Sequence, residues 1–168
     1  MALMAYMTIK GSKSGAISGP VTTKGREGSI SLLAFSQEIT SPRDPQSGLP
    51  TGQRLHKPVV ITKEIDKTSP LLYNVLCTNE NLTDVTIKFW QPQLKAVSGS
   101  GTEAQHYTVK LSNANISSMD VTTQEFSHDE KVSTAKVVEK LSFTYEKIEW
   151  TWNDGGITAN DTWGTHVS

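Results

Sequence analysis

The residue types that most often carry chemistry are sparse in this chain. Its four histidines, His56, His106, His128 and His166, include no pair in the H-x-x-x-H spacing that lets two imidazoles share a zinc ion. The single cysteine, Cys77, has no second thiol with which to form a disulfide or a metal pair. The spacing therefore predicts no metal site, and we expect each histidine to have a structural role.

Two other patterns could support catalysis in principle. Glu64 and Asp66 flank Ile65 like a pair of carboxylates for acid–base chemistry. They stand just before a helical pattern, however, where Asp66 is better placed to stabilise a turn. The segment Gly25-Arg26-Glu27-Gly28-Ser29 is rich in glycine but lacks the lysine of a phosphate-binding loop. With no G-x-S-x-G turn for a nucleophilic serine, the pattern supports neither an enzyme nor a bound cofactor.

Composition narrows the class of protein. The chain has 168 residues, which suits one domain over 1–168, and it carries 16 Lys+Arg against 17 Asp+Glu for a net charge of −1. A protein that binds nucleic acid through its phosphates usually has a clear basic excess, so nucleic acid is not an expected partner. No run approaches the ~20 apolar residues of a membrane helix. The short apolar run 2–7 is also a poor secretory signal.

Most of the chain alternates apolar and polar residues with a period of two, which is typical of half-buried β-strands. The clearest strands lie at 59–65, 85–90 and 106–111, and others are expected at 4–10, 29–40, 114–123 and 136–152. In 29–40 the alternation places Leu33 and Phe35 on one face, and Leu32, Ala34 and Ser36 on the other. We predict a mainly β fold of about seven or eight strands.

One segment, 70–79, predicts a helix. Ser69 is a good N-cap, and Pro70 fits the first turn because its missing N–H needs no partner there. Four apolar residues between positions 71 and 76 then repeat at helical spacing. Asn79 or Asn81 can end the helix in a left-handed conformation. The sequence therefore predicts a short amphipathic helix lying on the sheet.

The last long strand changes phase. Its apolar residues are odd-numbered up to Tyr145 and even-numbered from Ile148 onward. A bulge at Glu146-Lys147 would produce this change. Alternatively, the strand is straight and its second half faces another apolar surface, such as a partner.

Residues 40–54 predict a long connection. Three prolines and two glycines argue against regular structure there. Loops of about fifteen residues without secondary structure are uncommon and often functional. A plain connection between strands is the alternative.

Six separated stretches of the chain resemble the Hcp family, the hemolysin-coregulated proteins of bacterial type VI secretion. The strongest is the run Thr62-Lys63-Glu64-Ile65-Asp66-Lys67-Thr68-Ser69-Pro70-Leu71-Leu72-Tyr73. The others are 26–30, 51–58, 111–116, 143–151 and 161–163. They follow one another in family order and with family-like spacing, so the resemblance covers the chain from about residue 5 to residue 163.

The resemblance implies a small β-barrel of two packed antiparallel or mixed sheets with one short helix, similar to the tube proteins of phage tails. It implies hexameric rings that stack into the inner tube of a contractile machine and carry effector proteins in their lumen. The implied partners are the spike tip protein, the contractile sheath with its baseplate, and effector cargo. Such a protein lies in the bacterial cytoplasm until the machine expels it, which requires no signal peptide. Because the chain ends about five residues after the last matching stretch, no fused effector domain is expected.

The resemblance also suggests which residues make contacts between subunits. The stretch 40–54 corresponds to the family's extended loop, so the candidates for stacking one ring on the next are Arg43, Asp44, Leu49, Arg54 and His56. The candidates for the interface within a ring, or for the ends of the barrel, are Trp90, Ile148, Trp150 and Trp152. Ordinary core packing is the alternative for each residue of this second group.

The lumen should be lined by small or polar side chains that hold cargo weakly. Ala34, Ser36 and Glu38 share one parity and meet this description. A solvated sheet face is the alternative.

A second hypothesis belongs to another class of protein. The chain could be a monomeric, secreted β-sandwich that binds a carbohydrate or protein ligand through an exposed Trp90 or Trp163. The particle mass separates the two hypotheses, because a ring has several times the mass of the chain.

Overall fold

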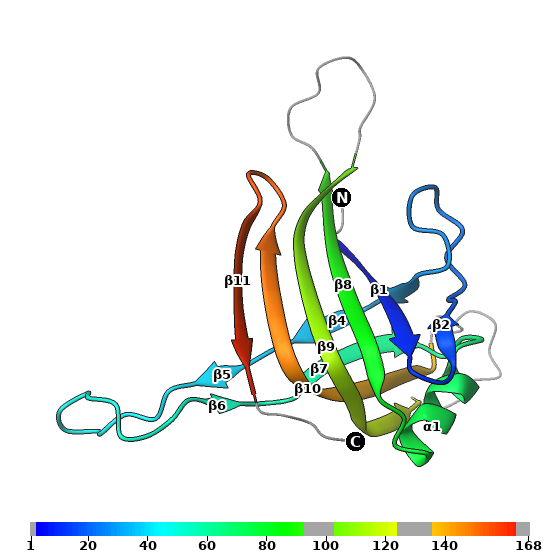
Figure 1. Ribbon diagram of the computed structural model, residues 1–168. Helices are drawn as coiled ribbons and strands as arrows, with labels where there is room; N and C mark the ends of the chain where they lie inside the picture. Colours follow the sequence, from blue (N-terminus) through cyan, green and yellow to red (C-terminus); the bar gives the residue numbers. More distant parts are fainter. Residues whose placement is uncertain (1–2, 93–102, 124–135, 164–168) are drawn as a thin grey trace.

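Eleven strands and one helix make up the described residues of the computed structural model, 3–92, 103–123 and 136–163 (Figure 1). In chain order they are β1 (Met4–Gly11), β2 (Gly15–Ile17), β3 (Ile30–Leu32), β4 (Ala34–Ser36), β5 (Ile39–Thr40), β6 (Leu55–His56), β7 (Val59–Glu64), α1 (Ser69–Cys77), β8 (Leu82–Pro92), β9 (Glu103–Thr122), β10 (Val138–Trp152) and β11 (Ile157–Thr162). Two of the histidines, His128 and His166, lie outside the described residues.

One bent antiparallel sheet holds nine of these strands. Its main path runs β2-β1-β8-β9-β10-β7-β4, while β3 pairs with β1 and β11 pairs with β10. The consecutive strands β3 and β4 join β1 to β7, so the sheet curls round its own core (Figure 1). The prediction of a mainly β fold with one short helix is confirmed. Within the described residues every pairing is antiparallel, and the two packed layers are halves of one sheet.

The predicted strand over 29–40 breaks at Leu33. Leu32 points into the core, whereas Ala34 and Ser36 are exposed, so the prediction that these three share a face is wrong. The break follows from topology, because β3 must pair with β1 and β4 must pair with β7. At the break the Leu33 N–H donates to the carbonyl of Thr62 at 2.7 Å.

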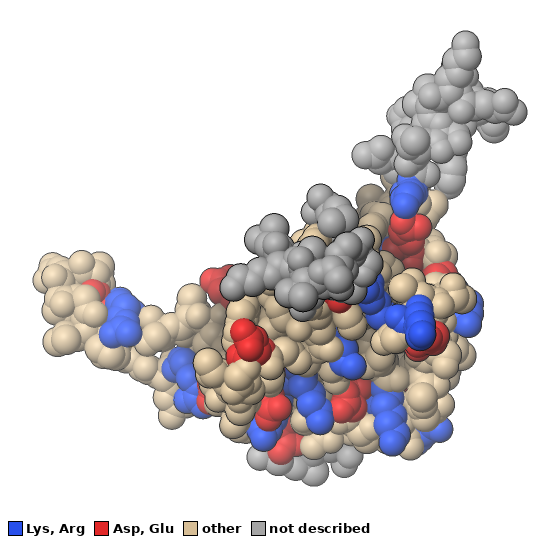
Figure 2. All heavy atoms as spheres, turned by 90° about the horizontal axis from the view of Figure 1, so that it is seen from above, with Lys and Arg blue, Asp and Glu red and all other residues tan. Residues whose placement is uncertain are grey.

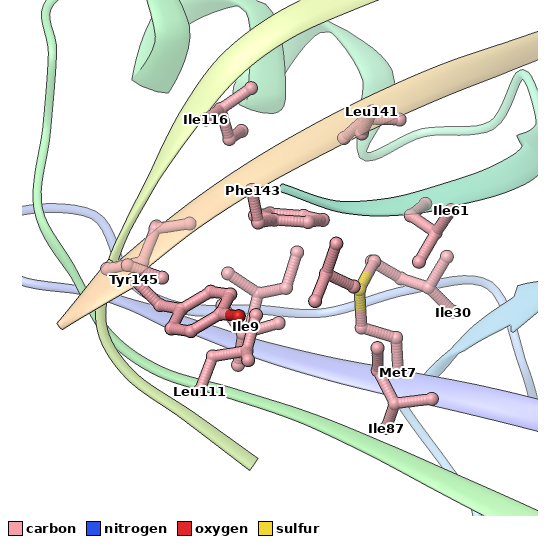
Figure 3. Close-up of a cluster of buried hydrophobic side chains, with 14 of the residues drawn as sticks. Met7, Ile9, Ile30, Ile61, Ile87, Leu111, Ile116, Leu141, Phe143 and Tyr145 are labelled. Carbon is pink, nitrogen blue, oxygen red and sulfur yellow. The ribbon is translucent and has the colours of Figure 1, made fainter. Parts of the chain in front are cut away.

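The core lies between the two halves of the sheet. Figure 3 shows Met7 and Ile87, from β1 and β8, pointing toward Ile61 and Phe143, from β7 and β10. All four side chains are completely buried. Full burial of an apolar side chain of this size stabilises a fold by about 1.5–3 kcal/mol. These contacts hold the two halves together.

Three neighbouring strands bend at the same level of the sheet. The inward-facing positions change parity at Thr83 in β8, Asn113 in β9 and Glu146 in β10, and none of the three is paired in the ladders between these strands. Asn113 has a φ of 49°, and its amide donates to Glu146 at 2.9 Å. The change of phase predicted near Glu146 is confirmed, and its cause is a shared bend rather than an insertion in one strand. The same bend joins the predicted strands 106–111 and 114–123 into one long β9.

The predicted helix is present, with a different start. The residue before the helix is Thr68, whose N–H donates to the carboxylate of Asp66 at 2.8 Å. The expected cap, Ser69, is buried inside the first turn, and its hydroxyl donates to Glu139 at 2.7 Å. The prediction that Ser69 caps the helix is therefore wrong, and Asp66 holds the turn as expected. Asn79, just beyond the helix, has a φ of 51°, which confirms the left-handed end.

A buried ion pair links β7 to β10 below this turn. Lys63 and Glu139 are directly paired across the two strands, both are 0% exposed, and the ammonium lies 2.5 Å from the carboxylate. The same ammonium contacts Asp66 at 3.1 Å. Lys63 shares the parity of the buried Ile61, which was the available signal for its burial. Ile65 has the same parity as Ile61 and Lys63 but is 47% exposed, since it lies just beyond the end of β7.

Candidate assembly surfaces

Residues 39–56 form a two-stranded arm that projects from one side of the body (Figure 1). At its base β5 pairs with β6, and farther out the Thr51 N–H donates to the Pro42 carbonyl at 3.0 Å. Arg43 and Pro50 form an isolated antiparallel bridge. The prediction that this stretch lacks regular structure is wrong at these pairs, because proline carbonyls can still accept hydrogen bonds.

The tip of the arm is held by Asp44. Its carboxylate accepts the N–H groups of Ser47 at 2.7 Å and Gln46 at 2.8 Å, and these bonds hold the pKa of Asp44 below its ordinary value. Because Asp44 is engaged within the tip, the outward-facing candidates there are Arg43 and Leu49. Both are exposed, Leu49 by 64%.

The root of the arm is fixed to the end of β11. The Arg54 guanidinium binds the Asp161 carboxylate through two nitrogens, and the His56 Nε2 lies 2.9 Å from the same carboxylate. On its other side the His56 Nδ1 lies 2.8 Å from the Tyr145 hydroxyl. The Trp163 ring stacks on His56 with 5.8 Å between centroids. We call Arg54, His56, Tyr145, Asp161 and Trp163 the root cluster.

The protonation of the root cluster follows from its donors and acceptors. Hydrogen bonds from Arg54 lower the pKa of Asp161 to about 2, so this carboxylate only accepts. The His56 Nε2 then lies against an acceptor, and its Nδ1 lies against the Tyr145 hydroxyl. Burial raises the pKa of Tyr145 to about 12, so its hydroxyl keeps its proton. Arg54 and His56 thus orient the arm, and the His56 ring is buried rather than presented to a neighbour.

The four aromatic and apolar candidates occupy different environments. The indole of Trp90 is covered by the Arg26 guanidinium, 4.1 Å from its ring centroid. Ile148 is completely buried, and Trp150 packs on the core and donates to Gln37 at 2.9 Å. Trp152 is 43% exposed at the end of β10. Of these four residues, Trp152 offers the largest accessible surface to a neighbour.

The three residues predicted to line the lumen lie in two different parts of the structure. Ala34 and Ser36 are exposed on β4, at the edge of an outward face that continues across β7, β10 and β9. We call this outward face the small-residue face. Two rows of paired residues cross it from β4 to β9. The first row is Ser36, Val60, Ser142 and Ser118, and the second is Ala34, Thr62, Lys140 and Asp120. Glu38 lies beyond β4 near the root of the arm, where it pairs with Lys57 at 3.1 Å.

Strand β11 forms an edge that the sequence reading did not find. It pairs with β10 alone among the described strands, and Ile157 at its start is 70% exposed. The turn Asp154-Gly155-Gly156 before it was the available signal, since glycines with φ of 84° and 64° reverse the chain there. An unpaired strand edge can bind another strand through its backbone groups.

Charge is distributed in small alternating groups. Figure 2 shows Lys and Arg beside Asp and Glu over the face in view, without a large region of one sign. Among the described residues no group of three or more His, Cys, Asp or Glu side chains is placed to hold a metal ion. No helix in these same residues is long and apolar enough to span a bilayer.

Comparison with known families gives this fold its context. A family model described as "Type VI secretion system effector, Hcp" matches residues 6–152. The chain belongs to the Hcp family. It is 39% identical over 180 residues to the "Major exported protein" of Pseudomonas aeruginosa, covering 100% of this chain and 99% of that protein. Membership of Hcp and the name of this relative indicate a secreted protein of the type VI system.

Solved Hcp structures share the fold. A structure named "Crystal structure of Hcp protein" has a TM-score of 0.84 and 30% identity, and the match covers 98% of this chain and 99% of that one. The secreted protein Hcp3 from Pseudomonas aeruginosa has a TM-score of 0.75 and 32% identity, with 98% and 100% covered. The resemblance found in the sequence is therefore confirmed, and the matched family is one of secretion rather than a known enzyme family.

Proposed function

We propose that this Hcp-family chain is a structural subunit of the inner tube of a type VI secretion machine. Six copies form a ring, rings stack into a tube, and the lumen holds effector proteins until the tube is expelled. The observation that carries the proposal is the arm. An ordered hairpin fixed at its root, with Arg43 and Leu49 exposed at its tip, is suited to reach a neighbouring copy.

Other surfaces support the same assembly. A ring of identical copies needs two different complementary surfaces on each copy. The edge of β11 with Trp152 and Ile157 is an apolar candidate for one of these surfaces, whereas the arm is the candidate for stacking one ring on the next. The small-residue face around Ala34 and Ser36 suits a lumen, because its side chains are mostly small or polar and therefore hold cargo weakly.

We also propose where the subunit is found and which partners it contacts. The subunit resides in the bacterial cytoplasm before firing and leaves the cell with the tube, so it needs no signal peptide. Its partners are other copies, the spike tip protein, the contractile sheath with its baseplate, and effector cargo. Chemistry on the target belongs to the cargo, and the subunit itself acts as a single non-enzymatic tube domain.

The monomeric binding module receives less support. A carbohydrate site on tryptophan needs a free ring face to stack on a sugar. The Trp90 ring carries the Arg26 guanidinium at 4.1 Å, and the Trp163 ring stacks on His56. Both proposed platforms already have ring-face contacts within the chain.

The arm can be tested by changing its tip while leaving its root and Asp44 intact. Arg43→Glu and Leu49→Asp should reduce tube formation, seen as shorter or absent tubes in negative-stain images, with an unchanged circular dichroism spectrum. Lys110→Glu alters an exposed cation on the body and serves as the control. Tubes of unchanged length in both tip variants, at several salt concentrations, would contradict the role of the arm.

A further inference from the structure

A hollow lies on the body where β7 ends. It has a volume of about 320 Å³ and is lined by Pro20, Ser31, Leu33, Glu64, Ile65 and Asp66. Leu33 is 51% exposed and Ile65 is 47% exposed. Two large apolar side chains thus line a concave surface that the described part of the chain leaves open to solvent. We call it the Leu33 hollow.

The rim of the Leu33 hollow is acidic. Glu64 pairs with Lys136 at 2.5 Å, while Asp66 and Glu139 both contact the Lys63 ammonium. These ion pairs join three carboxylates to two ammonium groups and so carry a net charge of −1, with Glu64 as the carboxylate most exposed to solvent. Because the Glu64 and Lys136 side chains are 44% and 63% exposed, this surface pair can rearrange around an incoming cation.

The tip of the arm has the complementary chemistry. It presents one exposed cation, Arg43, and one exposed apolar side chain, Leu49. The hydrogen bond from the Asp44 N–H to the Leu49 carbonyl, 2.9 Å long, holds these two positions on facing sides of the hairpin. A guanidinium can bind a carboxylate through two parallel hydrogen bonds, which makes Glu64 a suitable acceptor.

We propose that the Leu33 hollow receives the arm tip of a second copy of this chain. Leu49 packs on Leu33 and Ile65, and Arg43 binds Glu64. The inference rests on the proposed tube function, and it names the surface on which the arm docks.

The positions of arm and hollow favour a neighbour over the same chain. Strand β7 starts two residues after the arm ends and has six residues, so it carries the chain about 20 Å from the root of the arm before Glu64 is reached. Figure 1 shows the arm projecting from one side of the body while β7 runs toward the opposite side, where α1 begins. Two complementary surfaces on opposite sides let each copy bind the next one head to tail, as the stacking of one ring on another requires.

Disulfide trapping tests the contact directly. Leu49→Cys combined with Leu33→Cys, in a Cys77→Ser background, should give covalent dimers and higher multimers on non-reducing gels after mild oxidation. Leu49→Cys combined with Lys110→Cys is the control and should give no ladder above background. Rings of hexamer mass with no ladder from the Leu49 and Leu33 pair would overturn this inference and leave the ring proposal standing. A mass of one chain at every concentration would overturn both.

Exchange of charge tests the same contact without cysteines. Arg43→Glu alone and Glu64→Arg alone should each weaken assembly about five-fold per contact, which corresponds to about 1 kcal/mol for an exposed pair. An equal mixture of the two variants should regain assembly, because each arm then meets a hollow of opposite charge. If the mixture assembles no better than either variant alone, the pairing of Arg43 with Glu64 is wrong.

Discussion

At the scale of single residues, burial determines how much stability is lost when a charged side chain loses its partner. Lys63 and Glu139 are fully buried and pair with each other, whereas Lys136 and Glu64 form a similar pair at the surface. Removing one partner of a buried pair leaves a charge without water or counter-ion, which is far more costly than exposing a surface charge. The two pairs are neighbours along the chain, since Glu64 follows Lys63 at the end of β7 and Lys136 lies two residues before β10, and they therefore provide a matched comparison.

Glu139→Ala should lower the free energy of unfolding by about 3–5 kcal/mol, because the Lys63 ammonium loses its closest partner inside the fold. Lys136→Ala, which breaks the exposed pair, should cost less than about 1 kcal/mol. Urea denaturation followed by tryptophan fluorescence measures both. Equal losses in the two variants would contradict the assignment of Lys63 and Glu139 as a buried pair.

The root cluster should be sensitive to acid. The pKa of Asp161 is lowered from 3.8 to about 2, mainly by Arg54, so the folded state favours the charged form. This contribution to stability is fully present above the ordinary pKa and is lost as the pH falls through the lowered one. The urea midpoint of the original chain should therefore exceed that of Asp161→Asn at neutral pH, and the difference should shrink between pH 3.8 and about 2.

Asp154→Asn, in the turn before β11, is the control for removing one exposed carboxylate. A difference between the original chain and Asp161→Asn that persists undiminished near pH 2 would show that the Asp161 charge does not stabilise the root.

At the scale of elements, the bend shared by β8, β9 and β10 shapes the barrel. Asn113 takes a φ of 49° there, a conformation that glycine and asparagine adopt far more readily than β-branched residues. Asn113→Val should destabilise the protein by about 1–3 kcal/mol, whereas Asn113→Gly should cost less because glycine meets no strain. Thermal unfolding of the two variants gives the comparison. A valine variant as stable as the glycine variant would show that the backbone at this bend is not strained.

The helix and the strands also show how much of the fold could be predicted from the sequence. Alternation predicted the long strands and the change of phase near Glu146, and helical spacing predicted the helix after Pro70, because these features depend on neighbours along the chain. The break at Leu33 depends on which strands lie on either side, and alternation carries no such information. The arm was missed as a hairpin because its prolines and glycines argued against regular structure, although its other residues and the Pro42 carbonyl can form backbone hydrogen bonds, and β11 was missed behind its glycine turn.

The same limit applies to the candidate residues. The family resemblance could suggest Arg54, His56 and Ile148 for contacts between subunits, but their environments come from the tertiary fold. Arg54 and His56 bind Asp161, more than a hundred positions away, and Ile148 is completely buried. Parity did carry an unused signal for Lys63, which follows the buried Val59 and Ile61.

At the scale of the whole molecule, the small-residue face predicts how cargo is held. Ser36→Gln adds a longer side chain to this face and should reduce retention of a co-expressed effector while leaving the mass of the ring unchanged. Ser12→Gln, an exposed serine in the turn after β1, is the matched control. Unchanged retention, or loss of the ring itself, would show that Ser36 does not face a lumen.

We propose above all that this nearly neutral chain acts only as part of a closed assembly of identical copies. The most direct measurement is the particle mass by light scattering coupled to size-exclusion chromatography. A hexameric ring should have a mass of roughly 110 kDa, six times the 18.4 kDa of the chain, and larger stacked species should form at high concentration. A single peak at 18.4 kDa over the whole accessible range of concentration would contradict it.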